Sequence, residues 1–318
     1  MYKQWIWLDG RWLPHNQATI SVLSHGLHYG TGVFEGIRSY ATMSGPRIFK
    51  LDAHLERLAR GARRLGLPCG DVTLTTLAGA CREALERNAL GDAYLRPLLF
   101  WGEVPGGVAG GADRPGLAID VGSQVVHTMV TALPWSSHLG SSTQKCGVRA
   151  TISTLTRNPA DAIPPLKLTG GYVNATLAKL AASELGFDEA IFVDRAGLVV
   201  EATAENVFAV FHAGGRERVI AVEHPDALPG ITRATVLEMT GGESRALALE
   251  ELLEADEVFL TGTSAEIAPV REIDGRAFGV GETVRRVQRQ YADLVRDRGL
   301  RSIDAPANPA PAFSTVAP

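Results

Sequence analysis

The chain has 318 residues, of which 45% are hydrophobic and 21% charged, enough for a sizeable core in about two domains. Its formal net charge of -4, and the lack of an apolar run of membrane-spanning length, argue against a nucleic-acid partner and against a membrane. Its three cysteines form no CxxC pair and the N-terminus lacks a signal peptide's apolar core, so we expect a cytoplasmic protein.

An N-terminal hairpin is predicted, because the favoured turn pair Asp9-Gly10 separates two short apolar runs. A segment rich in glycine and aromatic residues follows at 24–38. Its glycines resemble a dinucleotide-binding loop, but the third lies one position too far along. Two histidines here could bind a metal, or could pack as hydrogen-bonded polar residues, since no carboxylate or cysteine cluster accompanies them: His25 and His28.

Two helices are expected next, at about 52–65, with Asp52 as the cap, and at about 74–88. In the first helix, Arg57 lies off the apolar stripe. Residues 94–100 have the composition of a strand, and Pro97 within it favours an edge strand or a bulge.

Lys167 lies in an apolar, glycine-containing loop that follows the extended Pro164-Pro165 pair. An amine in such a loop loses hydration, which favours its neutral form, and a neutral amine can form a Schiff base with a carbonyl. The alternative is an ordinary loop lysine with its charge in water. A helix is predicted from Tyr172 to Gly186, with one face formed by Leu177, Leu180 and Ala181.

Glu201 follows the apolar strand 198–200, where a carboxylate needs a partner. It could hold a proton on a pyridine nitrogen, or it could be an exposed strand end. The segment 228–232 predicts a helix start whose N–H groups suit a phosphate, and a second small-residue loop follows at 261–263. Amine, carboxylate, phenol and phosphate cradle are together the parts that hold pyridoxal phosphate.

Two α/β domains are expected. The N-terminal domain covers 1–133, an interdomain linker covers 134–142, and the C-terminal domain, which carries Lys167, covers 143–302. The strands of the second domain are predicted at 190–193, 198–200, 206–211 and 258–260, and its last helix at about 282–298. Residues 303–318 are rich in alanine and proline and are expected to form a mobile tail.

The chain resembles the class IV pyridoxal-phosphate aminotransferases of fold type IV and, within them, the branched-chain amino-acid aminotransferases. Matching segments run from Trp7 to about Tyr291, and the strongest are 24–38, 94–98, 228–233 and 261–270. The resemblance implies an α/β (α+β) fold of two domains, like that of D-amino-acid aminotransferase, with pyridoxal 5'-phosphate between them. It also implies a homodimer or higher homo-oligomer, in which the neighbour supplies part of each substrate pocket.

The resemblance also implies roles for single residues. Lys167 would be the catalytic residue, as Schiff-base lysine and proton shuttle, Glu201 would pair with the pyridine nitrogen, and Tyr172 would bond the ring hydroxyl oxygen. The phosphate would be held by Arg57, Ile231, Thr232 and Thr263. Tyr94, with the backbone of Thr263 and Ser264, would bind the substrate α-carboxylate. Arg96 and Tyr29 would bind the distal carboxylate of glutamate. Phe34 and Gly36 would line the pocket for the substrate side chain.

The sequence departs from the branched-chain pattern at three places. Ala202-Thr203-Ala204 replaces Gly-Ala-Gly, which adds a methyl group close to the substrate at Ala204. Leu168-Thr169-Gly170 replaces Ala-Gly-Gly, and His138 stands where a tyrosine is common. These departures leave the cofactor residues unchanged and alter the substrate wall.

The expected activity is amino transfer between an L-amino acid, branched-chain or a related hydrophobic one, and a 2-oxo acid, with glutamate as partner. The rivals are a fold type IV lyase, a D-amino-acid aminotransferase, and a non-catalytic protein that binds pyridoxal phosphate. Arg96 and the segment around Tyr172 favour the L-branch, and the presence of Lys167 and Glu201 argues against a non-catalytic protein.

Overall fold

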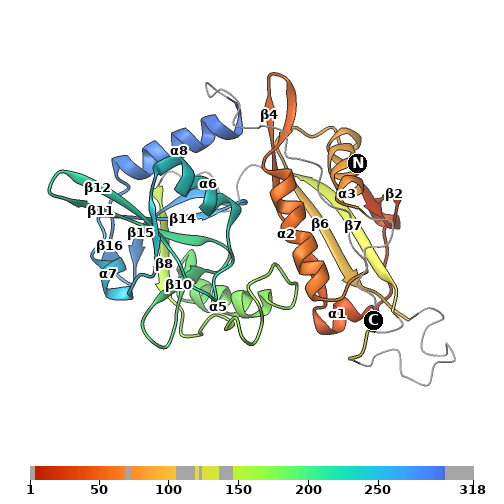
Figure 1. Ribbon diagram of the computed structural model, residues 1–318, viewed down its shortest axis with the longest axis horizontal. Helices are drawn as coiled ribbons and strands as arrows, with labels where there is room; N and C mark the ends of the chain where they lie inside the picture. Colours follow the sequence, from red (N-terminus) through yellow and green to blue (C-terminus); the bar gives the residue numbers. More distant parts are fainter. Residues whose placement is uncertain (1–3, 69–72, 105–118, 122–123, 136–145, 298–318) are drawn as a thin grey trace. The chain divides into compact units, whose positions relative to one another are not determined.

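Figure 1 shows the computed structural model, which describes residues 4–68, 73–104, 119–121, 124–135 and 146–297. The chain forms two compact units: unit 1 comprises Met1–Pro134, Leu166–Gly170 and Val295–Pro318, and unit 2 comprises Trp135–Pro165 and Gly171–Leu294. This division differs from the expected one because the segment with Lys167 belongs to unit 1, where its backbone pairs with a strand. Most of the expected linker, His138 within it, and the expected tail lie outside the described residues.

Unit 1 is built on a seven-stranded antiparallel sheet with the order β2-β1-β7-β6-β4-β5, and with β3 beside β6. Asp9 and Gly10 turn the predicted N-terminal hairpin with φ angles of 48° and 81°, which confirms it. The strands are β1 (Trp5–Leu8), β2 (Arg11–Pro14), β3 (Gly32–Phe34), β4 (Ile37–Thr42), β5 (Gly45–Ile48), β6 (Ala93–Trp101) and β7 (Val126–Pro134).

The prediction of an edge strand or bulge around Pro97 was wrong, because β6 lies in the middle of the sheet. On one side Pro97 pairs with Val130 of β7; on the other, the neighbour changes from β4, opposite Leu95, to β3, opposite Leu98. The Pro97 carbonyl accepts a bond from the Glu35 N–H, in the break between β3 and β4, at 2.9 Å. The N–H and C=O of a strand residue point to the same neighbour, so the missing N–H of proline faces this break.

Two helices, α2 (Leu51–Arg64) and α3 (Leu74–Arg87), cover one face of this sheet (Figure 1). The N-cap of α2 is Lys50, with φ 51°, so the prediction that Asp52 caps the helix was wrong; Asp52 lies in the first turn, where an acid still favours the helix dipole. Although Arg57 is off the apolar stripe of α2, it is buried. The other helices in the described residues of the unit are short: η1 (His15–Gln17) and α1 (His25–Tyr29).

Unit 2 is built on a nine-stranded mixed sheet with the order β10-β9-β8-β15-β14-β11-β12-β13, and with β16 beside β15. The pairs β8–β9, β8–β15 and β12–β13 are parallel. All four predicted strands overlap observed ones. The strands are β8 (Val148–Ile152), β9 (Glu189–Val193), β10 (Val199–Ala202), β11 (Asn206–Ala213), β12 (Arg216–Val222), β13 (Glu243–Arg245), β14 (Glu257–Gly262), β15 (Glu266–Ile273) and β16 (Arg276–Ala277).

In the described part of unit 2, the helices are α5 (Tyr172–Glu184), α6 (Ile231–Thr240), α7 (Leu249–Leu253) and α8 (Glu282–Val295). In α5, the predicted face that carries Leu177 and Leu180 points outward: these side chains are 52% and 56% exposed. The buried face consists of alanines, whose small side chains let the helix approach β9 closely: Ala175, Ala178 and Ala182. Among the described residues, no helix is long and apolar enough to cross a membrane.

Candidate active site

Lys167 lies on a short extended segment that runs along β3 in unit 1. The Phe34 N–H donates to the Lys167 carbonyl at 3.1 Å, and the Thr169 N–H donates to the Gly32 carbonyl at 2.9 Å. Gly30, with φ 65°, makes this approach possible, because a side chain there would place its Cβ 2.6 Å from the Gly170 Cα. The Lys167 Nζ lies 5.0 Å from the centre of the Phe34 ring. The lysine that sequence reasoning placed in a loop is therefore held by a ladder of backbone bonds.

The departure at Thr169 has a structural role in this ladder. Its hydroxyl donates to the Gly30 carbonyl at 2.7 Å and accepts from the Gly32 N–H at 3.0 Å. An alanine or glycine at this position could make neither bond.

Arg57 is oriented by a buried carboxylate that sequence reasoning did not single out. The Glu35 carboxylate, which has no exposed surface, accepts from Arg57 Nε at 2.6 Å and from Arg57 Nη2 at 2.9 Å. The Nδ1 of His54, one turn earlier on α2, lies 2.8 Å from the same carboxylate. Burial alone would raise the pKa of Glu35, but the Arg57 charge and the bonds from His54 and Arg57 bring it down to about 2. The sequence signal for this cluster was the three-residue spacing of His54 and Arg57, which places both side chains on one face of α2.

The predicted substrate residues of β6 and β3 lie together. Arg96 Nη2 donates to the Tyr94 hydroxyl at 2.9 Å, and the Arg96 guanidinium lies 4.4 Å from the centre of the Phe34 ring. At Gly36 a Cβ would lie 1.9 Å from the Tyr94 hydroxyl, so only glycine fits. Arg96 Nε is buried and has no hydrogen-bond partner within the described ranges. The Arg96 guanidinium, which has this unsatisfied nitrogen and lies beside the Tyr94 phenol, can bind a carboxylate.

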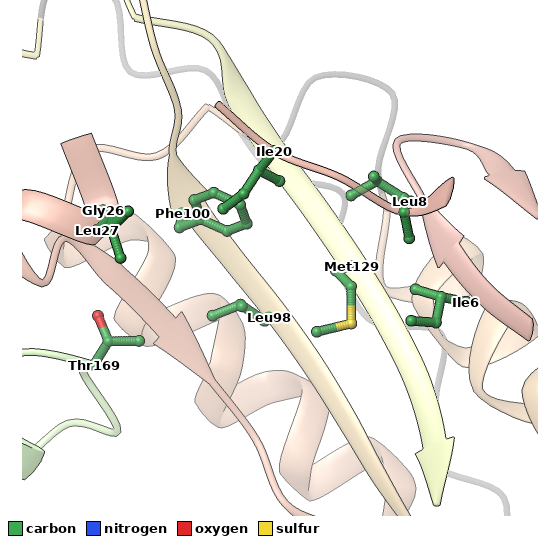
Figure 2. A pocket seen from close by; sticks show the side chains of 10 residues that line it. Ile6, Leu8, Ile20, Gly26, Leu27, Leu98, Phe100, Met129 and Thr169 are labelled. Carbon is green, nitrogen blue, oxygen red and sulfur yellow. The ribbon is translucent and has the colours of Figure 1, made fainter. Parts of the chain in front are cut away.

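Even-numbered residues of β6 face away from α2 and α3. Trp101, an odd-numbered residue, lies on the face that α2 covers, because its indole nitrogen donates to the Leu65 carbonyl at the end of α2. Side chains alternate along a strand, so the even-numbered residues lie on the other face. The even-numbered face continues past Arg96 into an apolar pocket of about 330 Å³ (Figure 2). Its lining comes from β1, the segment between η1 and α1, α1, β6, β7 and the lysine segment: Ile6, Leu8, Ala18, Ile20, Gly26, Leu27, Leu98, Phe100, Met129 and Thr169.

The helix α1 carries Tyr29, which is 44% exposed, with its ring 4.6 Å from that of His25. His25 is a packed polar residue: its ring nitrogens lie 2.7 Å from the Thr31 hydroxyl and 3.2 Å from the Ile119 carbonyl. In the part of the chain that the structure describes, no group of three potential ligands could hold a metal ion.

In unit 2, Glu201 at the end of β10 is 4% exposed, so it is not an exposed strand end. One oxygen accepts from Arg157 Nε at 2.8 Å; the other accepts from the Leu228 N–H at 2.9 Å and from Asn206 Nδ2 at 3.4 Å. Arg157 also bonds the Gly171 carbonyl, just before Tyr172 at the start of α5. Sequence reasoning missed Arg157 and Asn206, because neither has a sequence pattern of its own.

The N-terminus of α6 lies next to Glu201 and has no side-chain cap. Gly230, its N-cap, lets the chain pass close to Asn206, since a Cβ there would lie 1.9 Å from the Asn206 Oδ1. Thr232 follows, almost fully buried. Uncapped N–H groups at the start of a helix can bind a phosphate.

Two neighbouring turns of unit 2 carry the remaining predicted residues. Thr263 and Ser264 are half-buried in the β14–β15 turn, and Ala204 is exposed in the β10–β11 turn. The turns touch at Gly262, where a Cβ would lie 3.3 Å from the Ala204 carbonyl. The Thr261 hydroxyl is buried without a partner among the residues described. Unit 2 thus gathers a fixed carboxylate, a helix N-terminus and small polar turns.

Comparison with known proteins identifies the family. The family model "Amino-transferase class IV" matches residues 32–273. The branched-chain-amino-acid aminotransferase of Escherichia coli (strain K12) is 36% identical over 301 residues, which are 91% of this chain and 92% of that protein.

Solved structures agree with the sequence comparison. The T.th. branched-chain amino acid aminotransferase with pyridoxamine 5'-phosphate has a TM-score of 0.84 and 36% identity, over 93% of this chain and 95% of that one. Its complex with N-(5'-phosphopyridoxyl)-L-glutamate has a TM-score of 0.82 and 35% identity, over the same shares of the two chains. The matched span, the shared fold and the identity together show that the chain belongs to the class IV aminotransferase family.

Proposed function

We propose that this aminotransferase uses pyridoxal 5'-phosphate to move the amino group of a branched-chain or similar hydrophobic L-amino acid to 2-oxoglutarate. The observation that carries the proposal is the placement of Lys167 beside Phe34, Arg96 and Tyr94 in unit 1. The similar proteins are named for branched-chain amino acids, and one of them was solved with a phosphopyridoxyl-glutamate adduct.

The residues present fit the cofactor. Glu201, oriented by Arg157, Leu228 and Asn206, offers a fixed anion for the pyridine nitrogen, and Tyr172 offers a phenol for the ring hydroxyl oxygen. The uncapped start of α6, at Ile231 and Thr232, and the unsatisfied Thr261 hydroxyl suit phosphate oxygens. In unit 2, Thr263 would also contact the phosphate. In unit 1, Arg57, whose guanidinium is oriented by Glu35, is the residue assigned to bind it.

The bound cofactor supplies an electron sink for the negative charge that forms at the substrate α-carbon. Lys167 would bind the cofactor's aldehyde carbon and, when substrate takes its place, move a proton between the substrate α-carbon and the cofactor C4′ atom. Glu201 would keep the pyridine nitrogen protonated. Tyr94, with the backbone of Thr263 and Ser264, would hold the substrate α-carboxylate.

Arg96 would bind the distal carboxylate of glutamate, with Tyr29 assisting. Phe34 and Gly36 would line the side-chain pocket, and Ala204 would narrow it. We also propose a homodimer, because unit 1 exposes apolar side chains around the pocket of Figure 2: Ile20 at 46% and Leu27 at 64%. Tyr29, exposed on α1 beside Leu27, is then the residue that a neighbouring copy could share.

The test is a coupled assay followed by a label. Protein saturated with pyridoxal 5'-phosphate should convert more than one equivalent of L-leucine or L-valine per active site to its 2-oxo acid only when 2-oxoglutarate is present, and should form L-glutamate. Borohydride reduction should fix the cofactor to Lys167, and Lys167→Ala should abolish both results. Repeated keto-acid release without an acceptor would point to a lyase, and turnover of D-leucine would point to the D-branch. A label on Lys50 or Lys179 would refute the assignment of the lysine.

A further inference from the structure

Two buried carboxyl groups lie beside the β10–β11 turn of unit 2. Glu189, at the start of β9, is 1% exposed, and Glu205, in the turn, is 2% exposed. Consecutive N–H groups of the turn donate to the two carboxyl groups, Thr203 to Glu189 Oε1 at 3.4 Å and Ala204 to Glu205 Oε2 at 3.3 Å, so the carboxyl groups lie close together. Two ionised carboxylates at this distance, shielded from water, would repel each other strongly. One of the two must therefore carry a proton.

The donors around the pair decide which carboxyl group is ionised. Glu189 Oε2 accepts from Lys179 Nζ at 2.7 Å, and Oε1 accepts from the Thr203 hydroxyl at 2.6 Å and from the Ala190 N–H at 2.8 Å. These are the partners of an anion. Glu189 is the ionised member.

Glu205 has the opposite surroundings. Its Oε2 accepts a long bond from the Ala204 N–H at 3.3 Å, and its Oε1 is buried with no donor in the described part of the chain. A proton on Glu205 turns this unsatisfied group into a donor toward Glu189. Burial and, after it, the Glu189 charge raise the pKa of Glu205 to about 8, although the Lys179 charge acts in the opposite direction.

We infer that Glu205 works as a neutral carboxylic acid bonded to the Glu189 carboxylate, and that this proton-sharing pair positions the Thr203–Ala204 turn as the substrate wall of unit 2. The inference rests on the proposed function, because that function makes Ala204 a substrate contact. Glu205 is a positioning residue, since it acts through its neighbours.

The bonds from the pair to the turn are direct. Glu189 holds the Thr203 hydroxyl, and the Glu205 carbonyl accepts from the Ala202 N–H at 2.8 Å. On the other side, a Cβ at Gly262 would lie 3.2 Å from the Glu205 Cγ, so the Glu205 side chain packs against the β14–β15 turn. Loss of the proton would place two anions beneath Thr203 and push the turn away from Gly262.

Other charged groups near the pair have partners of their own. α5 contributes Lys179, which bonds Glu189. The Asp188 carboxylate accepts from the Arg149 N–H, and Glu201 pairs with Arg157. The segment 262–265 of the facing turn has no titratable side chain. Glu205 is therefore the group whose ionisation would change the charge beneath Thr203.

Glu205→Gln is the decisive variant, because the amide keeps the shape and a donor but cannot ionise. At pH 9, one unit above its pKa of about 8, about a tenth of Glu205 is still protonated. From pH 7 to pH 9, kcat/KM of the wild type for L-leucine should therefore fall about tenfold more than kcat/KM of the variant. At pH 7 the two proteins should agree within about twofold. Glu250→Gln, an exposed change on α7, should keep the wild-type profile. Overlapping profiles of wild type and Glu205→Gln would overturn the inference.

A second measurement does not depend on turnover. The cofactor-free wild type at pH 7 should show an infrared carbonyl band of a protonated carboxylic acid that disappears by pH 10, and Glu205→Gln should lack the band at both pH values. If the wild type lacks the band at pH 7, Glu205 does not carry the proton and the inference is overturned. If the band is present but the kcat/KM profiles of wild type and Glu205→Gln overlap, the positioning role of the pair is overturned. Absence of transamination would refute the proposed function instead, and the band would still report on the proton.

Discussion

Three buried carboxyl groups of this chain differ in charge and task because their partners differ. Glu35 faces the Arg57 guanidinium and is ionised far below neutral pH. Glu201 faces the Arg157 guanidinium and two further donors. Glu205 faces another carboxylate, which favours its neutral form. Under the proposed function, the same type of side chain would orient the arginine assigned to the phosphate, hold a proton on the pyridine nitrogen, or support a turn.

Glu201→Gln should bind pyridoxal 5'-phosphate and lose activity by on the order of a hundredfold or more, because an amide cannot supply the anion that keeps the pyridine nitrogen protonated. The measurement is kcat at saturating cofactor, with bound cofactor counted from absorbance. Near-normal turnover would mean that Glu201 serves only the fold of unit 2.

Arg157→Met tests a residue that the sequence did not single out. Removal of the guanidinium leaves the Glu201 carboxylate buried with fewer donors, which should cost about 3 kcal/mol in the free energy of unfolding. We also expect weaker cofactor binding, because the carboxylate is free to turn. Denaturant titration of the cofactor-free protein and titration with pyridoxal 5'-phosphate check the two effects. An unchanged cofactor affinity would show that Arg157 does not orient Glu201.

Arg96→Met should weaken L-glutamate far more than L-leucine. Without the guanidinium, the distal carboxylate would be buried unpaired, a loss of about 2–5 kcal/mol. Ala204→Gly is the matched comparison: it should widen acceptance of L-leucine and L-valine by about 1–3 kcal/mol, the worth of one carbon in an apolar pocket. The measurement is kcat/KM for all three substrates. Equal losses for all three in Arg96→Met would place that arginine on the α-carboxylate.

At the scale of elements, the carboxylate of Glu35 and the hydroxyl of Thr169 each connect separate segments of unit 1. Glu35, in the break between β3 and β4, ties that break to α2 through His54 and Arg57. Thr169 ties the lysine segment to the turn before β3. The part of unit 1 that carries Lys167 therefore depends on polar contacts as well as on its apolar core.

Glu35→Gln should lower the free energy of unfolding at pH 7 by about 3 kcal/mol, because it breaks a buried pair. The pKa of Glu35 falls from 4.5 to about 2 on folding, so its contribution is present above pH 4.5 and is lost as the pH falls toward 2. The difference between wild type and variant should therefore shrink from pH 5 to pH 3. Urea unfolding at these pH values measures it, with the exposed Glu56→Gln on α2 as control. A difference that stays constant with pH would show that the Glu35 carboxylate is not ionised in the folded state.

At the scale of the whole molecule, apolar surface remains uncovered on each unit. In unit 1, Leu27 lines the pocket of Figure 2 and is 64% exposed. In unit 2, α5 exposes Val173, Leu177 and Leu180 at helical spacing. Apolar surface of this kind marks an interaction site in soluble proteins.

Sedimentation of the wild type should give about twice the chain mass of 33.9 kDa, as expected for the proposed homodimer. Leu27→Asp should shift the protein toward the monomer and reduce activity, since Tyr29 would lose its place in the neighbouring copy. Met43→Asp, an equally polar change at a fully exposed position, should do neither. A wild-type monomer with full activity would refute both the dimer and the sharing of Tyr29.

The sequence by itself was sufficient for the local elements and for the family. The Asp9-Gly10 hairpin, the start of α6 within 228–232 and the strands of unit 2 follow from turn residues and apolar runs, which act over a few residues. The match of residues 32–273 to class IV aminotransferases bears out the resemblance. The roles of single site residues stay predictions that the variants above test.

Only the tertiary structure decided which distant groups meet. Pro97 can occupy a central strand because β3 and β4 leave a break opposite its missing N–H, and no local pattern reveals that break. The large side chains of α5 point outward because the helix packs its alanine face against β9 at short distance. Arg57 is buried because a carboxylate 22 positions earlier reaches it, and Glu205, in the β10–β11 turn, is neutral because Glu189 of β9 lies beside it. Charge and burial depend on neighbours in space, and the sequence orders only neighbours along the chain.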